Sequence, residues 1–169
     1  MRFAKNVDED SKNALTDLSH LFGTQLNLND RPKEFGDSIG ERLLVTQASV
    51  QSKSEEPTKK EGRLVCEIVV THDMLNYLGN VHGGCSAFLI DICSSMCLMV
   101  HQRGTHVSQS LDIVYHSPAM LGETLRIISN TMTMGARVMS ARTEIWNATK
   151  HRLVASGVHV KMQPSRPKL

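Results

Sequence analysis

Hydrophobic and polar residues change their spacing along the chain, and these changes predict a series of strands around one helix. The segment 62–71, GRLVCEIVVT, alternates apolar and polar positions, which is typical of a half-buried strand. Its apolar face carries Leu64, Cys66, Ile68 and Val70. The segment 84–101 is apolar at nearly every position and has the length of a helix that is buried on most sides. Four further strand-like stretches follow, at 106–115, 123–133, 137–147 and 152–162. One long helix with antiparallel-looking strands predicts an α+β fold in which the sheet wraps the helix.

The first 40 residues form a predicted extension ahead of this domain. Residues 11–22 have leucines at helical spacing and predict one short helix, and the turn formers that follow predict a loop. We expect residues 41–50 to form a strand and the polar segment 51–62 to be an exposed hairpin loop. The predicted organisation is an N-terminal extension over 1–40, one domain over 41–163 and a basic tail over 164–169.

Composition and charge narrow the function classes. The 169 residues include 40% hydrophobic and 21% charged residues with a net charge of +2, which is ordinary for a single globular domain. An aromatic content of 4% without clustered Lys and Arg argues against nucleic-acid binding. The apolar stretch after Gly84 is shorter than the roughly 20 residues of a membrane span and has Asp91 inside it. We therefore expect no membrane span and no nucleic-acid partner.

The four cysteines show neither a CxxC pair nor the spacing of a disulfide scaffold, and no secretory signal is visible near Met1. The acidic N-terminus argues against a mitochondrial transit peptide. The C-terminal Pro167-Lys168-Leu169 is one residue away from the Ser-Lys-Leu peroxisomal signal. We expect a cytoplasmic protein, and a peroxisomal or mitochondrial location stays open.

Asp91 is the one charged residue inside the predicted helix. A carboxylate in apolar surroundings is costly unless it is paired, hydrogen-bonded or used. Its neighbours on the same helical face are mostly small or polar, which leaves room beside the carboxylate for a ligand or another chain. These neighbours are Gly84, Ala87, Phe88, Ser94, Ser95 and Leu98. The alternative is that Asp91 merely hydrogen-bonds Ser94, Ser95 or nearby backbone.

His82, Gly83 and Gly84 directly precede this helix. Glycines there leave backbone N–H groups uncovered at the positive end of the helix dipole, which suits an anion or a developing oxyanion, although a tight turn is the commoner use. His82 could polarise a carbonyl or hold backbone, and no histidine has the spacing of a metal site. Nine helical residues rise about 13 Å, so Asp91 should not reach His82 within one chain. This distance favours a homodimer, or a dimer of dimers, with a composite site.

Two stretches of the chain resemble a known family. LNYLGNVHGGCSAFLID (75–91) is similar to the signature of the hotdog-fold acyl-CoA thioesterases, in particular the group of thioesterase superfamily member 2 and the phenylacetyl-CoA thioesterases. SLDIVYHSPAMLGETL (110–125) resembles the same family's next strand and turn. The resemblance runs from about Glu41 to Gln163. It implies a hotdog fold, with one long central helix wrapped by an antiparallel sheet that dimerises through the sheet.

The resemblance also implies an activity, the hydrolysis of an acyl-CoA to a carboxylic acid and CoA, with no metal and no cofactor beyond the CoA of the substrate. Asp91 stands where the family keeps its catalytic carboxylate, which acts as general base or as nucleophile. Gly83 matches the glycine whose N–H holds the thioester oxygen, and His82 matches the histidine beside it. Asn76 falls at an active-site asparagine. Ser108 falls where a serine helps to place the water, with Asp91 supplied by the opposite subunit.

Coenzyme A carries phosphates, so cationic side chains should line its route. By position the candidates are Arg137, Arg142, Lys150, Arg152 and Lys161. Of these we name Arg137, together with Gly84, as substrate-binding residues. Two other functions remain open. One is a non-catalytic hotdog protein that binds acyl-CoA or another apolar ligand, and the other is a hydratase or dehydratase, which would need an Asp and a His side by side.

Overall fold

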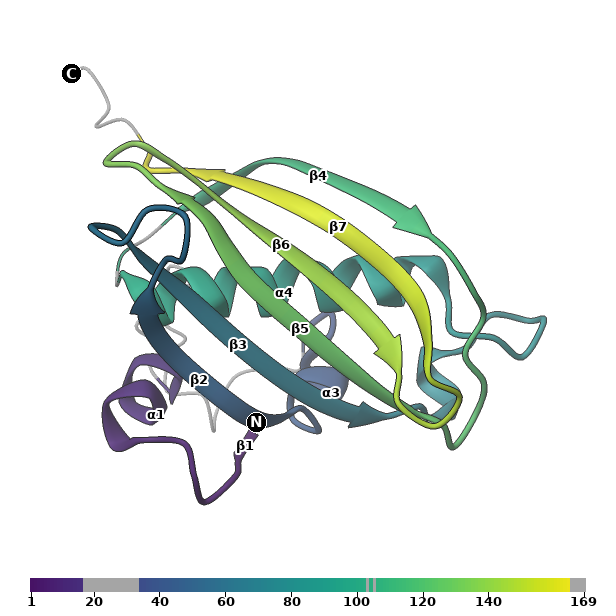
Figure 1. Cartoon of the computed structure of the whole chain (residues 1–169). Helices are drawn as coiled ribbons and strands as arrows, with labels where there is room; N and C mark the ends of the chain where they lie inside the picture. Colours follow the sequence, from purple (N-terminus) through teal and green to yellow (C-terminus); the bar gives the residue numbers. More distant parts are fainter. Residues whose placement is uncertain (17–33, 103, 105, 165–169) are drawn as a thin grey trace.

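The computed structural model describes residues 1–16, 34–102, 104 and 106–164. Seven strands form one sheet in the order β1-β2-β3-β5-β6-β7-β4, and a long helix, α4, lies across its inner face (Figure 1). Neighbouring strands are antiparallel except β1 and β2, which are parallel. The strands are β1 (Arg2–Phe3), β2 (Leu44–Ser52), β3 (Lys60–Val69), β4 (Val107–Tyr115), β5 (Thr124–Met134), β6 (Val138–Asn147) and β7 (Arg152–Met162). The predicted α+β fold, a central helix on an antiparallel sheet, is confirmed.

The strands form where the alternating pattern predicts them, because every second side chain points to the helix. In β3 the predicted apolar face is buried, and Cys66 and Ile68 lie opposite Ile127 and Leu125 of β5 in the sheet register. Burying one such side chain stabilises a protein by about 1.5–3 kcal/mol. The inner face of the sheet is therefore the wall of one core, which the helix closes.

Helix α4 (Gly83–His101) supplies the other side of this core. Leu89, Ile90, Cys93, Met96 and Cys97 are fully buried against the sheet. With 19 residues and a mean hydropathy of 1.7, the helix is long and apolar enough to cross a membrane by length and composition alone, so its length by itself does not exclude a span. Most of the helix is packed inside the protein, however, as the core helix of a globular domain is.

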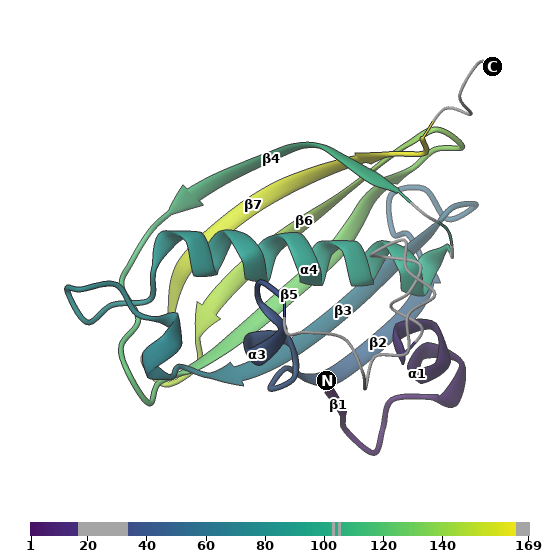
Figure 2. The same cartoon turned by 180° about the vertical axis from the view of Figure 1, so that it is seen from behind.

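The sheet covers only one side of α4, and Figure 2 shows the helix from the other side. Ala87, Phe88, Asp91 and Ile92 form a stripe that is only partly buried. The side chain of Asp91 is 49% exposed. The expectation that the carboxylate sits in buried, apolar surroundings is therefore wrong for the single chain. A sheet can bury only one stripe of a helix, and Asp91 lies on the stripe that faces away.

The N-terminal extension adds a strand that the sequence pattern does not predict, because two-residue β1 is too short to show alternation. Helix α1 (Glu9–Thr16) begins earlier than the predicted helix over 11–22, since Asp8 caps it by accepting a 2.8 Å hydrogen bond from Ser11 N. Residues 17–22 of that prediction, like the tail from 165, lie outside the described residues. The described residues also contain two short helices, α3 (Asp37–Gly40) and the 3₁₀ helix η1 (His72–Met74).

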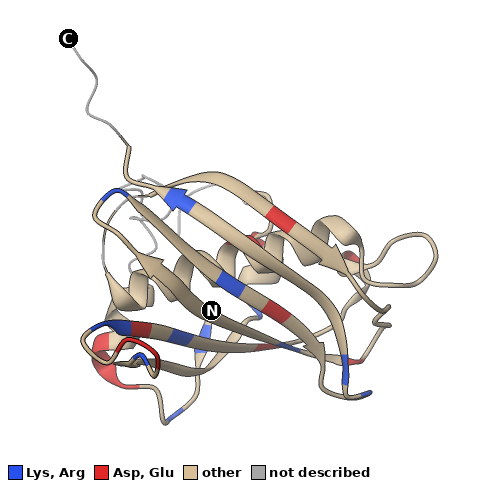
Figure 3. Cartoon of the chain, turned by 45° about the horizontal axis from the view of Figure 1, so that its top comes forward, with Lys and Arg blue, Asp and Glu red and all other residues tan. Residues whose placement is uncertain are grey.

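The predicted hairpin loop over 51–62 is shorter than expected, because the two strands extend into both of its ends. The register of β2 and β3 continues to the pair Ser52 and Lys60, so only residues 53–59 connect the two strands. Polar side chains at the outer end of this hairpin pair with each other, as when Gln51 Nε2 donates to Glu61 Oε1 at 3.0 Å. Charges of both signs are interspersed over the sheet (Figure 3). The described part of the chain thus presents no broad face of one sign.

Candidate active site

The N-terminus of α4 is shaped by its own first residues. His82 is the N-cap in an extended conformation, and its Nδ1 accepts a hydrogen bond from Gly84 N at 2.9 Å. This bond satisfies one of the free N–H groups at the start of the helix. Because Nδ1 accepts, the neutral ring of His82 carries its proton on Nε2, and the residue is exposed. The Gly84 N–H that we named for substrate binding is therefore already used.

The Gly83 N–H, in contrast, has no acceptor among the residues that the structure describes. It lies at the positive end of the 19-residue helix, where backbone donors attract negative charge. The Tyr115 hydroxyl donates to Gly83 O at 3.1 Å, and the Tyr115 ring lies 3.5 Å from where a Cβ on Gly83 would be. A cavity of about 370 Å³ opens beside this glycine, between Val81, Pro118 and Val154. The structure thus presents one free backbone donor to a cavity.

Asn76 lies in the loop before the helix, and the oxygen and the nitrogen of its side-chain amide have different surroundings. Its Oδ1 accepts hydrogen bonds from Leu78 N at 2.9 Å and from Asn80 N at 3.2 Å, which holds the turn. A bridge between Leu75 and Val81 closes the base of this loop. The Nδ2 group has no partner within the described ranges. The amide can therefore keep the loop in place with its oxygen and donate to a ligand with its nitrogen.

Asp91 lies two turns further along α4 and meets a histidine that the sequence did not single out. Its Oδ1 is 3.5 Å from Nδ1 of His159 in β7, which is completely buried. Nδ1 is also 2.7 Å from Ser94 Oγ. The Ser94 hydroxyl donates to the backbone oxygen of Asp91 at 2.9 Å, so it binds the backbone and not the carboxylate. The carboxylate is thus left to face the imidazole on one side and solvent on the other.

Ser108 joins the same network from the edge strand. Its Oγ lies 2.9 Å from His159 Nε2. In the register of β4 and β7, Ser108 is opposite Lys161 and Leu111 is opposite His159, with a shift between Ser108 and Ser110. Paired residues point to the same face, so this bulge turns Ser108 towards the helix. The irregularity at the start of β4 is what brings the serine to the imidazole.

The environment keeps this imidazole neutral. Burial, and then the positive charge of Lys161, lower the pKa of His159 to about 4, and the Asp91 carboxylate acts in the opposite direction. At neutral pH His159 therefore has one N–H and one bare nitrogen. The imidazole can fix the orientations of the Asp91 carboxylate and the Ser108 hydroxyl relative to each other. Because it has no exposed surface, it does not contact a substrate itself.

The positions of the candidate cations differ from the expectation that they line a route for CoA. Lys161 is 7% exposed, and its Nζ donates to Ser95 Oγ of α4 at 2.9 Å. Arg142 pairs with Glu144, and Arg152 donates to the backbone oxygen of Pro118. Arg137 lies in the turn between β5 and β6, at the end of the sheet opposite to the start of α4 (Figure 1). Within one chain, then, Arg137 is not brought beside Gly83.

The candidate residues form two separate groups in one chain. Asn76, His82 and Gly83 lie at the start of α4, whereas Asp91 and Ser108 meet around His159. Eight residues of helix separate Gly83 from Asp91, a rise of roughly 12 Å. A single chain thus provides two halves of a site rather than one whole site.

Sequence reasoning missed His159, and it named Lys161 only as a candidate for the CoA route and not as a partner of Ser95 and Ser108. A usable signal exists in β7, where Ala155 and Gly157 alternate with larger residues and place positions 159 and 161 on the same face. Gly157 approaches Ile90 of α4 so closely that an added Cβ would lie 3.1 Å from its Cγ2. His159 and Lys161 continue the face of β7 on which Ala155 and Gly157 lie. Two polar residues at these positions could have predicted a polar network under the helix.

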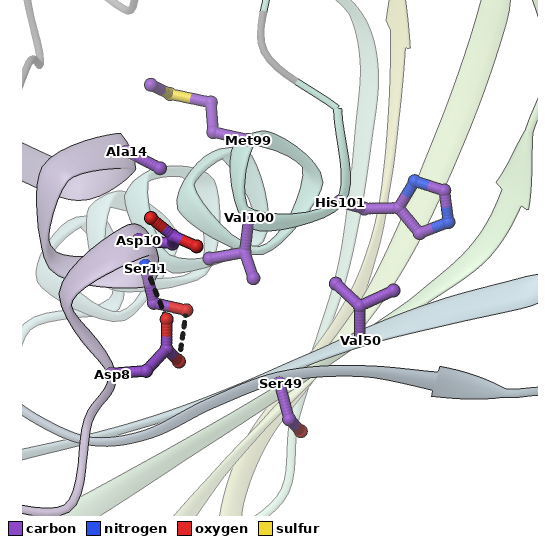
Figure 4. A pocket seen from close by; sticks show the side chains of 9 residues that line it. All are labelled: Asp8, Asp10, Ser11, Ala14, Ser49, Val50, Met99, Val100 and His101. Atoms are coloured by element: carbon purple, nitrogen blue, oxygen red, sulfur yellow. Dashed lines mark hydrogen bonds between the residues drawn. The ribbon is translucent and has the colours of Figure 1, made fainter.

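A second cavity of about 360 Å³ lies at the other end of α4, between this helix, α1 and β2 (Figure 4). Its two polar residues nearest α1, Asp8 and Ser11, are hydrogen-bonded to each other. None of the candidate site residues lines it. Among the described residues no group of His, Cys, Asp and Glu has the arrangement of a metal site.

Known proteins match both the sequence and the structure. A family model described as the thioesterase superfamily matches residues 78–154. Acyl-coenzyme A thioesterase 13 from Homo sapiens is 35% identical over 148 residues, which cover 87% of this chain and 97% of the relative. The crystal structure of thioesterase superfamily member 2 from Mus musculus aligns with a TM-score of 0.68 at 27% identity, over 92% of this chain and 98% of that one. The hotdog fold is therefore confirmed.

A hypothetical thioesterase from Streptococcus pneumoniae, solved with coenzyme A, aligns with a TM-score of 0.63. The alignment covers 76% of this chain and 90% of that one at 20% identity, so it supports the fold.

Proposed function

The chain belongs to the thioesterase superfamily, and from this premise we propose that it hydrolyses the thioester of an acyl-CoA to a carboxylic acid and CoA. The similarity to acyl-coenzyme A thioesterase 13 over nearly its full length supports this activity. The observation that carries the proposal is the Gly83 N–H, which has no acceptor in the described chain and belongs to a residue that lines a cavity at the positive end of α4. A backbone donor in this position stabilises the oxyanion that forms during acyl transfer.

The first half of the site binds and polarises the carbonyl. The thioester oxygen accepts a hydrogen bond from the Gly83 N–H. The Asn76 amide and the His82 Nε2–H, from the loop just before α4, are the further donors proposed for this oxygen. These bonds strengthen when negative charge develops on the oxygen, so they act more on the transition state than on the substrate. The cap and the turn hold these groups in place before a substrate arrives.

The second half supplies the attack. Asp91 takes a proton from a water molecule, whose oxygen attacks the thioester carbon. The tetrahedral intermediate expels the sulfur of CoA, and the thiolate takes the proton from Asp91. A thiol pKa near 8.5, by analogy with Cys, makes this sulfur a good leaving group without a strong general acid. In the alternative route Asp91 attacks the carbon directly and water hydrolyses the resulting anhydride.

The two halves meet when a second copy of the chain supplies Asp91 to the Gly83 of the first. The outer edge of β4 supports a dimer through the sheet, since it is the end strand of the sheet and exposes Val107, Val114 and Tyr115. Apolar residues on an unpaired edge strand favour pairing with another chain. Sedimentation should therefore give at least a dimer, and an active monomer would contradict the composite site.

The experiment that tests the proposal measures thiol release from short-chain, long-chain and aryl acyl-CoAs. The wild type should release thiol, and Asp91→Asn should fold and dimerise but lose turnover by about 10²–10⁴-fold, the usual effect of removing a positioned base. Asp10→Asn makes the same change at an exposed position of α1 and should have no effect. Acyl-CoA binding without thiol release from any substrate would instead make the protein a non-catalytic ligand-binding hotdog.

One observation favours a second candidate, the hydratase, because the structure places Asp91 and His159 3.5 Å apart. That reaction needs both side chains to reach the substrate. Complete burial of His159 argues against it. The same assays separate the two, since a hydratase would remove enoyl absorbance and leave the thioester intact.

A further inference from the structure

Lys161 is a buried cation that the proposed hydrolysis does not use. It lies near the end of β7, opposite Ser108 of β4 and Met139 of β6 in the register of the sheet. Its Nζ donates to Ser95 Oγ at 2.9 Å and to Ser108 Oγ at 3.5 Å. Lysine is almost never this buried unless its charge is compensated. Burial lowers the pKa of Lys161, and the carboxylate that acts against this is Asp91.

The hydrogen bonds from Lys161 towards Asp91 run in one direction. An ammonium only donates, so Ser108 Oγ accepts from Nζ and keeps its own O–H to donate. Ser94 Oγ, 2.7 Å from His159 Nδ1, already donates its proton to Asp91 O and therefore accepts from Nδ1, which carries the ring proton. The Asp91 carboxylate oxygen 3.5 Å from Nδ1 favours the same tautomer, because a bare nitrogen would repel it. His159 Nε2 is then bare, and the Ser108 hydroxyl 2.9 Å away donates to it. The order is ammonium to the Ser108 hydroxyl, that hydroxyl to the imidazole, and the imidazole N–H to the Ser94 hydroxyl, with the Asp91 carboxylate 3.5 Å from the same N–H.

We propose that Lys161 is a positioning residue for the hydrolysis: its ammonium orients the Ser108 hydroxyl towards His159 and thereby fixes the neutral imidazole whose N–H faces Asp91. The inference rests on the proposed function, in which Asp91 is the base. A neutral side chain at position 161 would let Ser108 rotate and would remove the positive charge that opposes an imidazolium. Lys161 therefore acts on Asp91 through two other side chains and does not touch the substrate.

The charges that act on His159 are few. They are Asp91 on α4 and Lys161 on β7, while the residues opposite His159 on β4 and β6 are Leu111 and Ala141. His106, ahead of β4, is a further titratable group in the range of Lys161, since burial and then this lysine lower its pKa. Because the lysine charge lowers the pKa of His159, its removal raises that pKa. His159 would then become a cation at a higher pH, deprive Ser108 of its acceptor and neutralise Asp91 as a base.

The experiment compares Lys161→Met with wild type and with Lys5→Met, which makes the same change at an exposed position between β1 and α1. Methionine fills most of the volume of the lysine stem but has neither charge nor N–H. Two quantities are measured, kcat/KM for thiol release against pH and the ¹⁵N shifts of the His159 ring against pH. In Lys161→Met we expect the acidic limb of kcat/KM and the His159 titration to move upwards together, by about one pH unit. Lys5→Met should leave both unchanged.

An unchanged acidic limb and unchanged His159 titration in folded Lys161→Met would overturn the inference, while the hydrolase activity of the wild type would stand. Wild type without thiol release would remove the proposed function, and the inference with it. If Lys161→Met does not fold, the wild-type spectra decide. A His159 that carries its proton on Nδ1 at neutral pH supports the inference, and one that is protonated on Nε2 contradicts it. A lysine with a purely structural role would change stability without moving the pH profile.

Discussion

The two halves of the candidate site are built in opposite ways. At the start of α4, the side chains of His82 and Asn76 are held by hydrogen bonds that span two to four residues of sequence. Tyr115 adds a long-range bond to Gly83 O. Around Asp91, the network joins α4 to β7 and β4, and its bonds span 51 to 66 residues. The first half therefore depends on local sequence and the second on the packing of the whole sheet. A change in one half should leave the geometry of the other intact.

Among changes in the first half, the largest effect should come from Gly83→Pro. Proline is tolerated at the first position of a helix, and His82 already has the extended conformation that a residue before proline prefers. The substitution removes only the N–H proposed to bind the oxyanion. We expect kcat for thiol release to fall by about 10²–10³-fold with little change in thermal stability.

Gly83→Ala is the control for this variant, since it keeps the N–H and its Cβ would lie in ordinary contact with Tyr115 at 3.5 Å. Equal losses in the two variants would show that space at position 83 matters and the donor does not.

The separation of the halves can be tested by mixing subunits. In a heterodimer of Gly83→Pro and Asp91→Asn chains, a composite site that combines Gly83 of one chain with Asp91 of the other is intact once and damaged once. We expect purified heterodimers to recover about half of the wild-type activity, although each homodimer has almost none. Lack of recovery in a heterodimer of proven composition would place both halves in one chain.

Of the two halves of the site, the second should make stability depend on pH. His159 has a folded-state pKa of about 4, below the 6.5 of an unfolded histidine. The unfolded chain thus binds an extra proton between these values, and stability falls as the pH drops through that window by about 1.4 kcal/mol per unit. The contribution is fully present above pH 6.5. Urea unfolding of His159→Gln should show a shallower loss in this window than wild type, and Gly83→Pro should keep the wild-type slope.

The smallest effect should come from Tyr115→Phe, which removes the hydrogen bond from the hydroxyl to Gly83 O and keeps the ring. An exposed bond of this kind contributes about 0.5–1.5 kcal/mol. We expect kcat to change by less than about tenfold, and the pH dependence of stability to stay as in wild type. A loss as large as that of Gly83→Pro would mean that the tyrosine, rather than the glycine N–H, shapes the cavity for the substrate.

The sequence by itself determined the strands and the central helix, because the alternation in 62–71 and the apolar run in 84–101 repeat over enough residues to be read. It also determined the first half of the candidate site, since an N-cap, a glycine pair and an asparagine turn act over a few residues. The extra strand β1 was too short to leave a pattern.

The tertiary structure alone decided which side of α4 stays open and therefore that Asp91 is half-exposed. It also decided that His159 and Lys161, 68 and 70 positions after Asp91, lie beneath that carboxylate, which follows from the register of β4 and β7 and from the bulge at Ser108. Strand pairing and helix placement depend on the whole core at once. The local sequence around any one of these residues therefore does not predict strand pairing or helix placement.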